Sequence, residues 1–235
     1  MKPFVPHDDS QACMPGMKAN ANGLDGKKEA EPPAPVHYFL SIHELDPNDI
    51  LKLRAYDSYG IHRVVYNLFE RVSSPDGQSG SGILHADLGK KRGKRQILIL
   101  SNREPSRPET GKLESRIIYP EFFDYTTYRF AITVNPVIRN NKTGKIEAIK
   151  GRKAIEKWFM GKAPSHGFEL VPGTLQTNRI TVDSFKKDNA CVTLGKASLG
   201  GMLSVTDKEL FVRAVQKGIG RGKAFGCGLL QIVPV

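Results

Sequence analysis

The chain has 235 residues, 39% of them apolar, and a formal net charge of +11. It contains no apolar run of the ~18 residues that a membrane-spanning helix needs. Its three cysteines form neither a C-x-x-C pair nor a Cys/His cluster, which argues against a structural zinc site or a disulfide framework. These features predict a cytoplasmic globular protein with no membrane partner, no bound metal and no cofactor.

The positive charge lies outside the first 35 residues. Residues 1–35 hold four Lys against five Asp and Glu, so the other 200 residues carry a formal charge of +12. A basic balance of this size favours a polyanionic partner, most often nucleic acid. A generally solvated basic surface is the alternative interpretation.

The first ordered element is predicted to begin near residue 36. Residues 1–35 are rich in Pro, Gly, Asn, Ala and Lys without a sustained period, which is typical of a disordered N-terminal extension. A chain that starts at Met14 or Met17 is the other interpretation. "VHYFLSIHEL" (36–45) follows as a strand, because apolar residues alternate along its central part.

The segment after this strand predicts a helix and three more strands. The helix is expected from about Asp57 to Glu70, with Asp57 or Ser58 as its N-cap. The elements that follow are the strands "GILHADL" and "RQILILS", a poorly formed helix around "RIIYPEFFDY", and the strand "YRFAITVNPVI" (128–138).

The second half repeats this order of elements. It reads as the strand "GKIEAI", the helix "RKAIEKWFMGK", the strand-like runs "GFELV", "TNRITVDSF", "ACVTLGK" and "LGGMLSV", a helix over 207–217, and the strand "CGLLQIVPV". Thr206-x-x-Glu209 reads as a capping box that opens the last helix, and Gly218 as the glycine that ends it.

Both halves therefore read as βαββαβ, the ferredoxin-like or RRM-like pattern. The order of elements repeats, while the sequence itself does not. We predict an α+β fold of tandem ferredoxin-like domains. The expected boundaries are an extension over 1–35, an N-terminal domain over 36–139 and a C-terminal domain over 140–235.

The loop 218–228, "GIGRGKAFGCG", does not match the known mononucleotide loops. A Walker A loop would need Gly at Lys217 and Ser or Thr at Ala224. A dinucleotide loop would need its third Gly at Lys223 or Phe225, and it would lie between a strand and a helix instead of a helix and a strand. These spacings exclude a nucleotide-dependent enzyme built on this loop.

The glycines of this loop permit close approach of the backbone to another group. They also let successive N–H groups point in one direction, and Arg221 and Lys223 add positive charge. Such a loop suits a run of phosphates in an RNA. A corner that packs the two domains together is the alternative.

The predicted helix over 57–70 separates two kinds of residue onto two faces. Its apolar face is expected to be core and consists of Ile61, Val64, Val65, Leu68 and Phe69. The opposite face gathers Tyr59, His62, Arg63 and Tyr66. A histidine with an ordinary pKa of ~6.5 can act there as a general acid or base. A plain surface histidine is the alternative.

Two stretches together resemble a known family. "YGIHRVVYNLF" and the terminal "GIGRGKAFGCGLL", supported by "LSVTDKELFVRAVQKGIG" and "YRFAITVNPVIR", resemble the CasE family of CRISPR repeat-processing endoribonucleases of type I-E systems. The resemblance covers about 36–235. It implies a tandem ferredoxin-like protein that binds the stem-loop of the CRISPR repeat.

The resemblance also implies an activity. Such an enzyme cleaves precursor crRNA at the 3′ base of the stem without metal, by attack of the 2′-OH. The products are a 2′,3′-cyclic phosphate and a 5′-OH. The enzyme then stays on mature crRNA as a subunit of the Cascade complex, beside other Cascade subunits and especially the backbone subunit.

Site residues follow from the same resemblance. The family's catalytic His and the Tyr three residues before it fall on His62 and Tyr59. RNA-binding candidates come from the helix, a first-half basic run, a second-half hairpin that resembles the stem-gripping hairpin, and the glycine loop: Arg63, Lys91, Arg92, Lys94, Arg179, Lys186, Lys187, Gly218, Gly220, Arg221, Gly222 and Lys223. For the basic run, a solvated loop tip is the alternative.

A second function stays open at this point. The chain could be a non-catalytic RNA-binding protein of tandem RRM type, or an assembly subunit that does not cut. No stretch matches the aromatic-rich RNP signature of RRM proteins, which counts against the first. Cleavage of a repeat RNA separates both from the enzyme.

Overall fold

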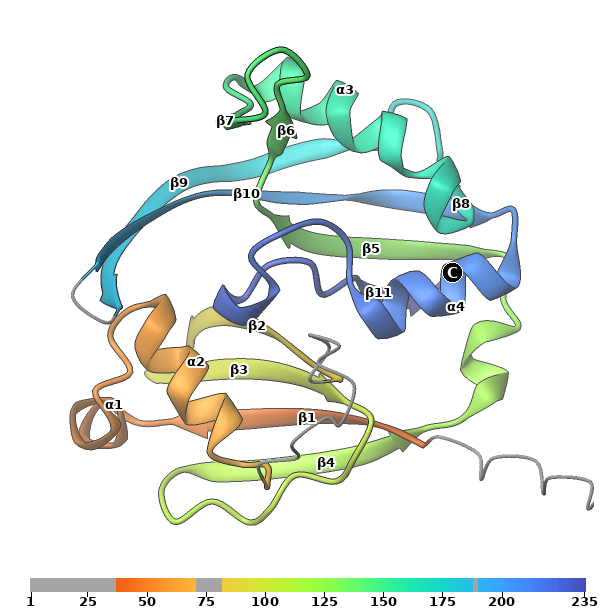
Figure 1. Cartoon of the computed structure of the whole chain (residues 1–235). Helices are drawn as coiled ribbons and strands as arrows, with labels where there is room; N and C mark the ends of the chain where they lie inside the picture. Colours follow the sequence, from red (N-terminus) through yellow and green to blue (C-terminus); the bar gives the residue numbers. More distant parts are fainter. Residues whose placement is uncertain (1–36, 71–81, 188–189) are drawn as a thin grey trace, which may run out of the picture. The chain divides into compact units, whose positions relative to one another are not determined.

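The computed structural model describes residues 37–70, 82–187 and 190–235, so the predicted extension over 1–35 lies outside the described residues. Figure 1 shows its helices and strands arranged around two main sheets. The elements are β1 (Tyr38–Leu45), α1 (Pro47–Leu53), α2 (Ser58–Tyr66), β2 (Ile83–Lys91), β3 (Lys94–Ser101), β4 (Lys112–Ile118), η1 (Pro120–Phe123), β5 (Thr127–Val134), β6 (Val137–Arg139), β7 (Ile146–Ala148), α3 (Arg152–Lys162), η2 (Pro164–His166), β8 (Phe168–Leu170), β9 (Gln176–Lys187), β10 (Ala190–Val205), α4 (Lys208–Lys217), η3 (Lys223–Phe225) and β11 (Gln231–Pro234).

The first sheet has the strand order β2-β3-β1-β4 and is antiparallel throughout. Alternation along β3 gives the sheet two apolar faces, because successive side chains of a strand point to opposite sides. Ile97 and Ile99 pack with α2, whereas Leu98 and Leu100 pack toward the second half of the chain. The first sheet is therefore covered on both faces.

Helix α2 packs through the face that its periodicity predicts. All five residues of the predicted apolar face belong to the core between α1, α2 and the first sheet: Ile61, Val64, Val65, Leu68 and Phe69. Asp57 is the N-cap and accepts a hydrogen bond from the Gly60 amide at 2.7 Å. The helix ends at Tyr66, four residues before the expected end. The short helix α1, with its Asp46/Asp49 capping box, was not predicted.

The second sheet has the strand order β11-β5-β10-β8, with β9 paired along β10. This is the ferredoxin-like order, with α3 and α4 as the two helices. Strand β10 runs unbroken for 16 residues where the sequence predicted two strands. Together β9 and β10 form a long hairpin (Figure 1). The N-cap of α4 is Asp207 and not Thr206, because the Asp207 side chain accepts the Leu210 amide at 2.9 Å.

The strand expected to close the first half belongs to the second sheet. β5 pairs with β10 and β11, and β4 closes the first sheet beside β1. The "GKIEAI" strand is likewise not part of a main sheet, because among the described residues β7 pairs only with β6. A division between 139 and 140 would separate paired strands, and we propose that the two domains meet within residues 119–126 instead.

The two sheets share one hydrophobic core. Leu84 and Ala86 of β2 and Leu100 of β3 belong to the same buried cluster as Phe130 of β5 and Phe159 of α3. Residues 36–235 accordingly form one compact unit. None of the helices in the described ranges is long and apolar enough to cross a membrane.

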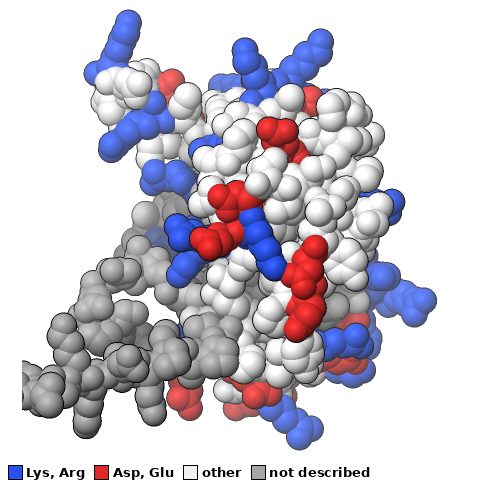
Figure 2. All heavy atoms as spheres, turned by 90° about the vertical axis from the view of Figure 1, so that its right-hand side faces the viewer, with Lys and Arg blue, Asp and Glu red and all other residues white. Residues whose placement is uncertain are grey.

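Charge is not one-sided on the face that carries α4 and the turn before β5. Figure 2 shows acidic and basic side chains mixed there around wide uncharged areas. One of the acidic–basic contacts of these elements is an ion pair between Lys208 and Asp124 at 2.5 Å. This face is therefore a poor candidate for binding a polyanion.

Candidate functional site

His62 lies where three elements meet. Its ring centroid is 6.1 Å from Tyr59 and 4.2 Å from Tyr66 on α2, and 5.9 Å from Phe225 on η3. Phe185 of β9 completes the cluster, 6.3 Å from Tyr59 and 4.8 Å from Phe225. His62 is half-buried in this aromatic cluster, so it is not the plain surface histidine of the alternative interpretation.

The glycine loop holds η3 against α2. The Ile219 amide donates to the Gly228 carbonyl at 2.9 Å, and the Gly228 amide donates to Thr133 of β5 at 2.7 Å. A Cβ on Gly228 would lie 2.7 Å from the Ile219 carbonyl oxygen, and a Cβ on Gly218 would lie 3.0 Å from Leu84 of the first sheet. The glycines therefore permit close packing across the seam between the two sheets, as one interpretation of the loop expected.

Other glycines of the loop leave room around the backbone. The nearest atom to a Cβ on Gly220 would be Trp158, at 4.0 Å, and a Cβ on Gly222 would make ordinary contacts at 3.4 Å or more. Arg221 is exposed and its backbone bridges to Asn135. Approach of an RNA to this part of the loop stays a prediction.

The pKa of His62 lies below its ordinary value. Burial in the aromatic cluster disfavours the imidazolium most, a hydrogen bond with the Ala224 backbone opposes this, and the nearby Lys187 charge lowers the pKa further. The Nδ1 atom is buried without a hydrogen-bond partner in the described part of the chain. Near neutral pH His62 is therefore a neutral imidazole, which can accept a proton.

Removal of the Lys187 charge should raise the pKa of His62. In Lys187→Ala the imidazolium loses a repulsive neighbour, so the pKa moves up toward its ordinary value. An NMR titration of the His62 ring protons measures this shift. Lys186→Ala is the matched control, since Lys186 points to the other face of β9 and does not act on His62. Equal shifts in both variants would contradict the assignment.

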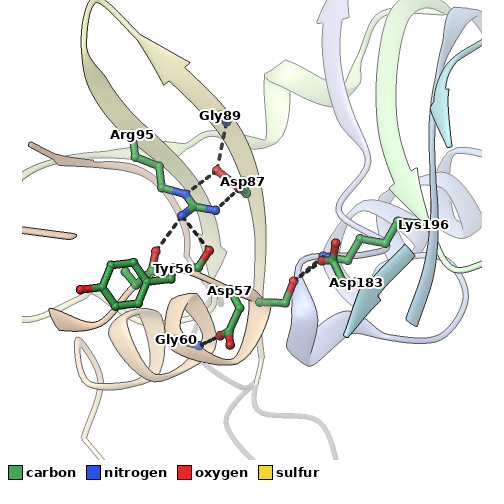
Figure 3. Close-up of polar contacts among 10 residues, drawn as sticks. Tyr56, Asp57, Gly60, Asp87, Gly89, Arg95, Asp183 and Lys196 are labelled. Carbon is green, nitrogen blue, oxygen red and sulfur yellow. Dashed lines mark hydrogen bonds and ion pairs between the residues drawn. The ribbon is translucent and has the colours of Figure 1, made fainter. Parts of the chain in front are cut away.

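A polar junction joins the start of α2 to the β9–β10 hairpin (Figure 3). Ser58 donates to Asp183 Oδ2 at 2.6 Å, Lys196 donates to Ser58 Oγ at 2.7 Å, and Lys196 Nζ lies 2.9 Å from Asp183 Oδ2. Burial raises the pKa of the Asp183 carboxyl, but these contacts outweigh it and hold the pKa below its ordinary value. The three side chains form a closed, half-buried triangle.

A second polar contact holds the same end of α2 to the first sheet. Arg95 binds Asp87 through two hydrogen bonds, at 2.7 and 3.2 Å, and donates to the Ala55 carbonyl at 2.6 Å (Figure 3). The helix that carries His62 is thus fixed from both sheets.

An open polar cavity of about 470 Å³ lies between the start of α2, the hairpin and Gly226. Its charged lining residues are Asp57, Asp87, Asp183, Arg95, Arg179 and Lys196. Hydroxyl groups supply much of the remaining lining, among them Ser58 and Thr181. The cavity offers hydrogen-bond donors and acceptors without a net charge.

The structure brings several predicted RNA-binding residues near His62. Arg63 lies over the Tyr59 ring, with its guanidinium carbon 5.6 Å from the ring centroid. Lys187 is close enough to lower the pKa of His62, and Lys223 lies in η3, where burial and then Lys217 lower its own pKa. Arg179 lines the cavity, and Lys186 is exposed near the end of β9.

The first-half basic run lies apart from these contacts. Lys91, Arg92 and Lys94 form the turn between β2 and β3, where Lys94 lies 3.8 Å from Glu44. The contacts of His62 come from α2, η3 and the end of β9 instead. A role of this turn in RNA binding stays a prediction, beside its alternative as a solvated tip.

Sequence reasoning missed the residues that other elements bring to α2. Phe225 of η3 lies beside His62 and Phe185 of β9 beside Tyr59, whereas Asp183 and Lys196 of the hairpin bind Ser58. Phe185 and Asp183 are two residues apart on β9 and so share one face, the one local signal that could have linked them. His85 was also missed as a buried residue, and burial lowers its pKa to about 3.

The residues around His62 include no recognisable metal site. Across 37–70, 82–187 and 190–235, no group of three or more His, Cys, Asp or Glu side chains could hold a metal ion. What the arrangement offers is a proton-transfer group beside aromatic rings, hydroxyl groups and lysine and arginine charges.

Comparisons with known proteins agree with the resemblance carried by "YGIHRVVYNLF" and "GIGRGKAFGCGLL". The CRISPR-associated endoribonuclease Cse3 of Thermus thermophilus is 31% identical over 116 residues, which cover 45% of this chain and 55% of Cse3. The chain thus spans about half the length of the curated relative that it matches. The resemblance to the CasE family is confirmed.

Solved structures with the same fold cover the chain more fully. Thermus thermophilus Cse3 "bound to an RNA representing a pre-cleavage complex" has a TM-score of 0.72 at 22% identity, over 84% of this chain and 100% of that one. A chain of a "CRISPR RNA-guided surveillance complex, pre-nicking" has a TM-score of 0.63 at 22% identity, over the same shares. These matches confirm the tandem ferredoxin-like α+β fold.

The family assignment rests on the sequence as a whole. The family described as "CRISPR associated protein" matches residues 38–234, which extend from β1 to the end of β11. The protein belongs to this family of CRISPR-associated proteins.

Proposed function

We propose that the protein is an endoribonuclease that binds the stem-loop of a CRISPR repeat and cleaves precursor crRNA once, at the 3′ base of the stem. The observation that carries this proposal is the position of His62, where α2, the β9–β10 hairpin and the glycine loop meet. The similarity of this chain to Cse3, which is named an endoribonuclease, supports the same activity.

The reaction is an intramolecular transesterification. The 2′-oxygen upstream of the cut attacks the phosphorus, and the bond to the 5′-oxygen of the next nucleotide breaks. A 2′,3′-cyclic phosphate and a 5′-OH result, so one proton leaves the 2′-OH and one reaches the 5′-oxygen. His62 moves one of these two protons, which is worth about 10²–10⁴-fold in rate. In this proposal neither of the two proton transfers uses a metal ion.

Tyr59 supports the reacting phosphate in this proposal. It lies one turn before His62 on the same face of α2, and Arg63 lies over its ring. Its hydroxyl can donate to a phosphate oxygen on which charge develops. Basic residues of the hairpin and the loop bind the RNA, whose A-form stem is recognised mainly through its shape and its backbone: Arg179, Lys186, Lys187, Arg221 and Lys223.

After cleavage the protein stays on the crRNA as a subunit of a Cascade complex. The solved structure of an RNA-guided surveillance complex that contains a chain of this fold supports this part of the proposal. The partners are then the mature crRNA and other Cascade subunits, especially the backbone subunit.

The first test is cleavage of the cognate repeat RNA in excess EDTA. We expect one cut at the base of the stem, and no cut when the nucleotide upstream of it carries a 2′-deoxyribose. Binding of the deoxy RNA should be retained. Binding without cleavage of the all-ribose RNA would instead favour the non-catalytic RNA-binding or assembly protein. Cleavage only with added divalent metal would overturn the metal-independent mechanism.

A further inference from the structure

The open cavity beside the start of α2 has no role in the proton transfer described above. It lies between α2, the concave side of the β9–β10 hairpin and Gly226 (Figure 3 shows several of its lining residues). Its volume of about 470 Å³ is large enough for a single nucleotide. Its position and its lining residues indicate which ligand would fit it.

Two residues that line the cavity lie close to His62 in the chain or in space. Ser58 lines it, and His62 follows four residues later on the same face of α2, about 6 Å along the helix axis. Gly226 also lines it and directly follows Phe225, whose ring is 5.9 Å from His62. An RNA whose scissile phosphate lies at His62 would place a neighbouring nucleotide at the cavity.

The charge of the cavity favours a base over a phosphate. The chain outside residues 1–35 carries +12, yet this cavity has three carboxylates against three cations. A phosphate there would meet Asp57, Asp87 and Asp183, whereas an uncharged base would meet paired donors and acceptors. Contacts to phosphates position an RNA, and contacts to base edges specify its sequence.

Two groups in the cavity are available for a base edge. Asp183 uses only Oδ2 for Ser58 and Lys196, which leaves Oδ1 to accept hydrogen bonds. The Arg179 guanidinium makes no hydrogen bond or ion pair within the described residues and can donate in pairs. Guanine presents both matching edges, since its O6 and N7 accept from arginine and its N–H groups donate to a carboxylate.

We propose that this cavity receives the base of a nucleotide that adjoins the cleaved phosphate, with guanine the best fit. The inference rests on the proposed function, because it needs an RNA cleaved at His62. RNA-binding proteins commonly read bases that are splayed out of a helix. The contacts among Ser58, Asp183 and Lys196 fix these lining side chains before the base binds. Binding therefore loses less side-chain entropy.

The test combines a change in the RNA with a change in the protein. Repeat RNAs carry one abasic ribose at each of the two positions that flank the cut. With the wild-type protein, one of these RNAs should be cleaved roughly 5–150-fold more slowly than the intact RNA. Thr181→Trp fills the cavity, so this variant should cleave the intact RNA slowly and lose nothing further with the abasic RNA.

Ile180→Trp is the matched control for this variant. Ile180 precedes Thr181 on β9, points to the other face and is 47% exposed, so its substitution should preserve the dependence on the base. Equal, independent losses from the abasic RNA and from Thr181→Trp would overturn the proposal, and so would the absence of any base dependence in the wild type. Failure of the wild type to cut intact RNA would instead refute the proposed function.

A second pair of changes tests the contact between the cavity and the base if Thr181→Trp does not fold. Arg179 is exposed, so Arg179→Met should fold normally. Replacement of the cavity guanine by 7-deazaguanine removes the N7 acceptor and should slow the wild type several-fold. Arg179→Met should be insensitive to this replacement. A variant as sensitive as the wild type would exclude a contact between Arg179 and the base.

Discussion

Substitution of His62 by Ala is expected to slow cleavage of the repeat RNA by about 10²–10⁴-fold, the usual contribution of a general acid or base. The loss follows from the position of the imidazole, which lies half-buried between α2 and η3 and is neutral near neutral pH. Single-turnover rates with the enzyme in excess measure the chemical step directly. RNA affinity, measured on 2′-deoxy RNA that cannot be cut, should change little because the hairpin and the loop are intact.

His37→Ala serves as the control for this substitution. His37 is exposed just before β1 and makes none of the contacts of the aromatic cluster, so its loss should leave the rate unchanged. A His62→Ala protein that cuts at the wild-type rate would remove His62 from the mechanism, while the family assignment would stand. A matching loss of RNA affinity would instead indicate that His62 holds the RNA.

Substitution of Gly228 by Ala should lower the free energy of unfolding by roughly 2–6 kcal/mol, from backbone strain and overpacking together. Gly228 has φ +85°, which a residue with a side chain rarely adopts, and its added Cβ would lie 2.7 Å from the Ile219 carbonyl oxygen. The backbone fixes the positions of both the added Cβ and the carbonyl oxygen, so no side-chain rotation can relieve this contact. Urea denaturation followed by circular dichroism measures the loss.

Gly220→Ala separates the two causes of this loss. Gly220 lies in the same loop with φ +81°, but the nearest atom to its added Cβ is Trp158 at 4.0 Å. It should therefore show only the strain of a positive φ, about 1–3 kcal/mol. If both variants lose the same stability, the close packing at Gly228 contributes nothing, and the loop is not the clamp across the seam that the contacts indicate.

Local periodicity and capping residues made most helices predictable. Ile61, Val64 and Val65 lie on one face of α2 as their spacing requires, and Gly218 ends α4 because its φ of +73° suits few other residues. The neighbours of His62 along α2 were predictable for the same reason, since Tyr59 and Tyr66 lie one turn away on either side. These features depend on residues close together in the chain.

Strand pairing was less predictable, as β5 illustrates. Tyr128, Phe130, Ile132 and Val134 alternate as in any half-buried strand, and nothing in that pattern says which sheet they join. The pairing with β10 and β11 decides it, and those strands lie some 70 to 100 residues later in the chain. The order of elements alone therefore placed β5 in the wrong half.

The sequence by itself determined the kind of fold, the helix that carries His62 and Tyr59, and the glycine loop near the C-terminus. Only the tertiary structure decided what surrounds this helix. Ser58 meets Asp183 and Lys196 across separations of 125 and 138 residues, and Phe225 reaches His62 from the far end of the chain. Contacts of this kind form when distant segments pack around a common core, so no local pattern of residue types records them.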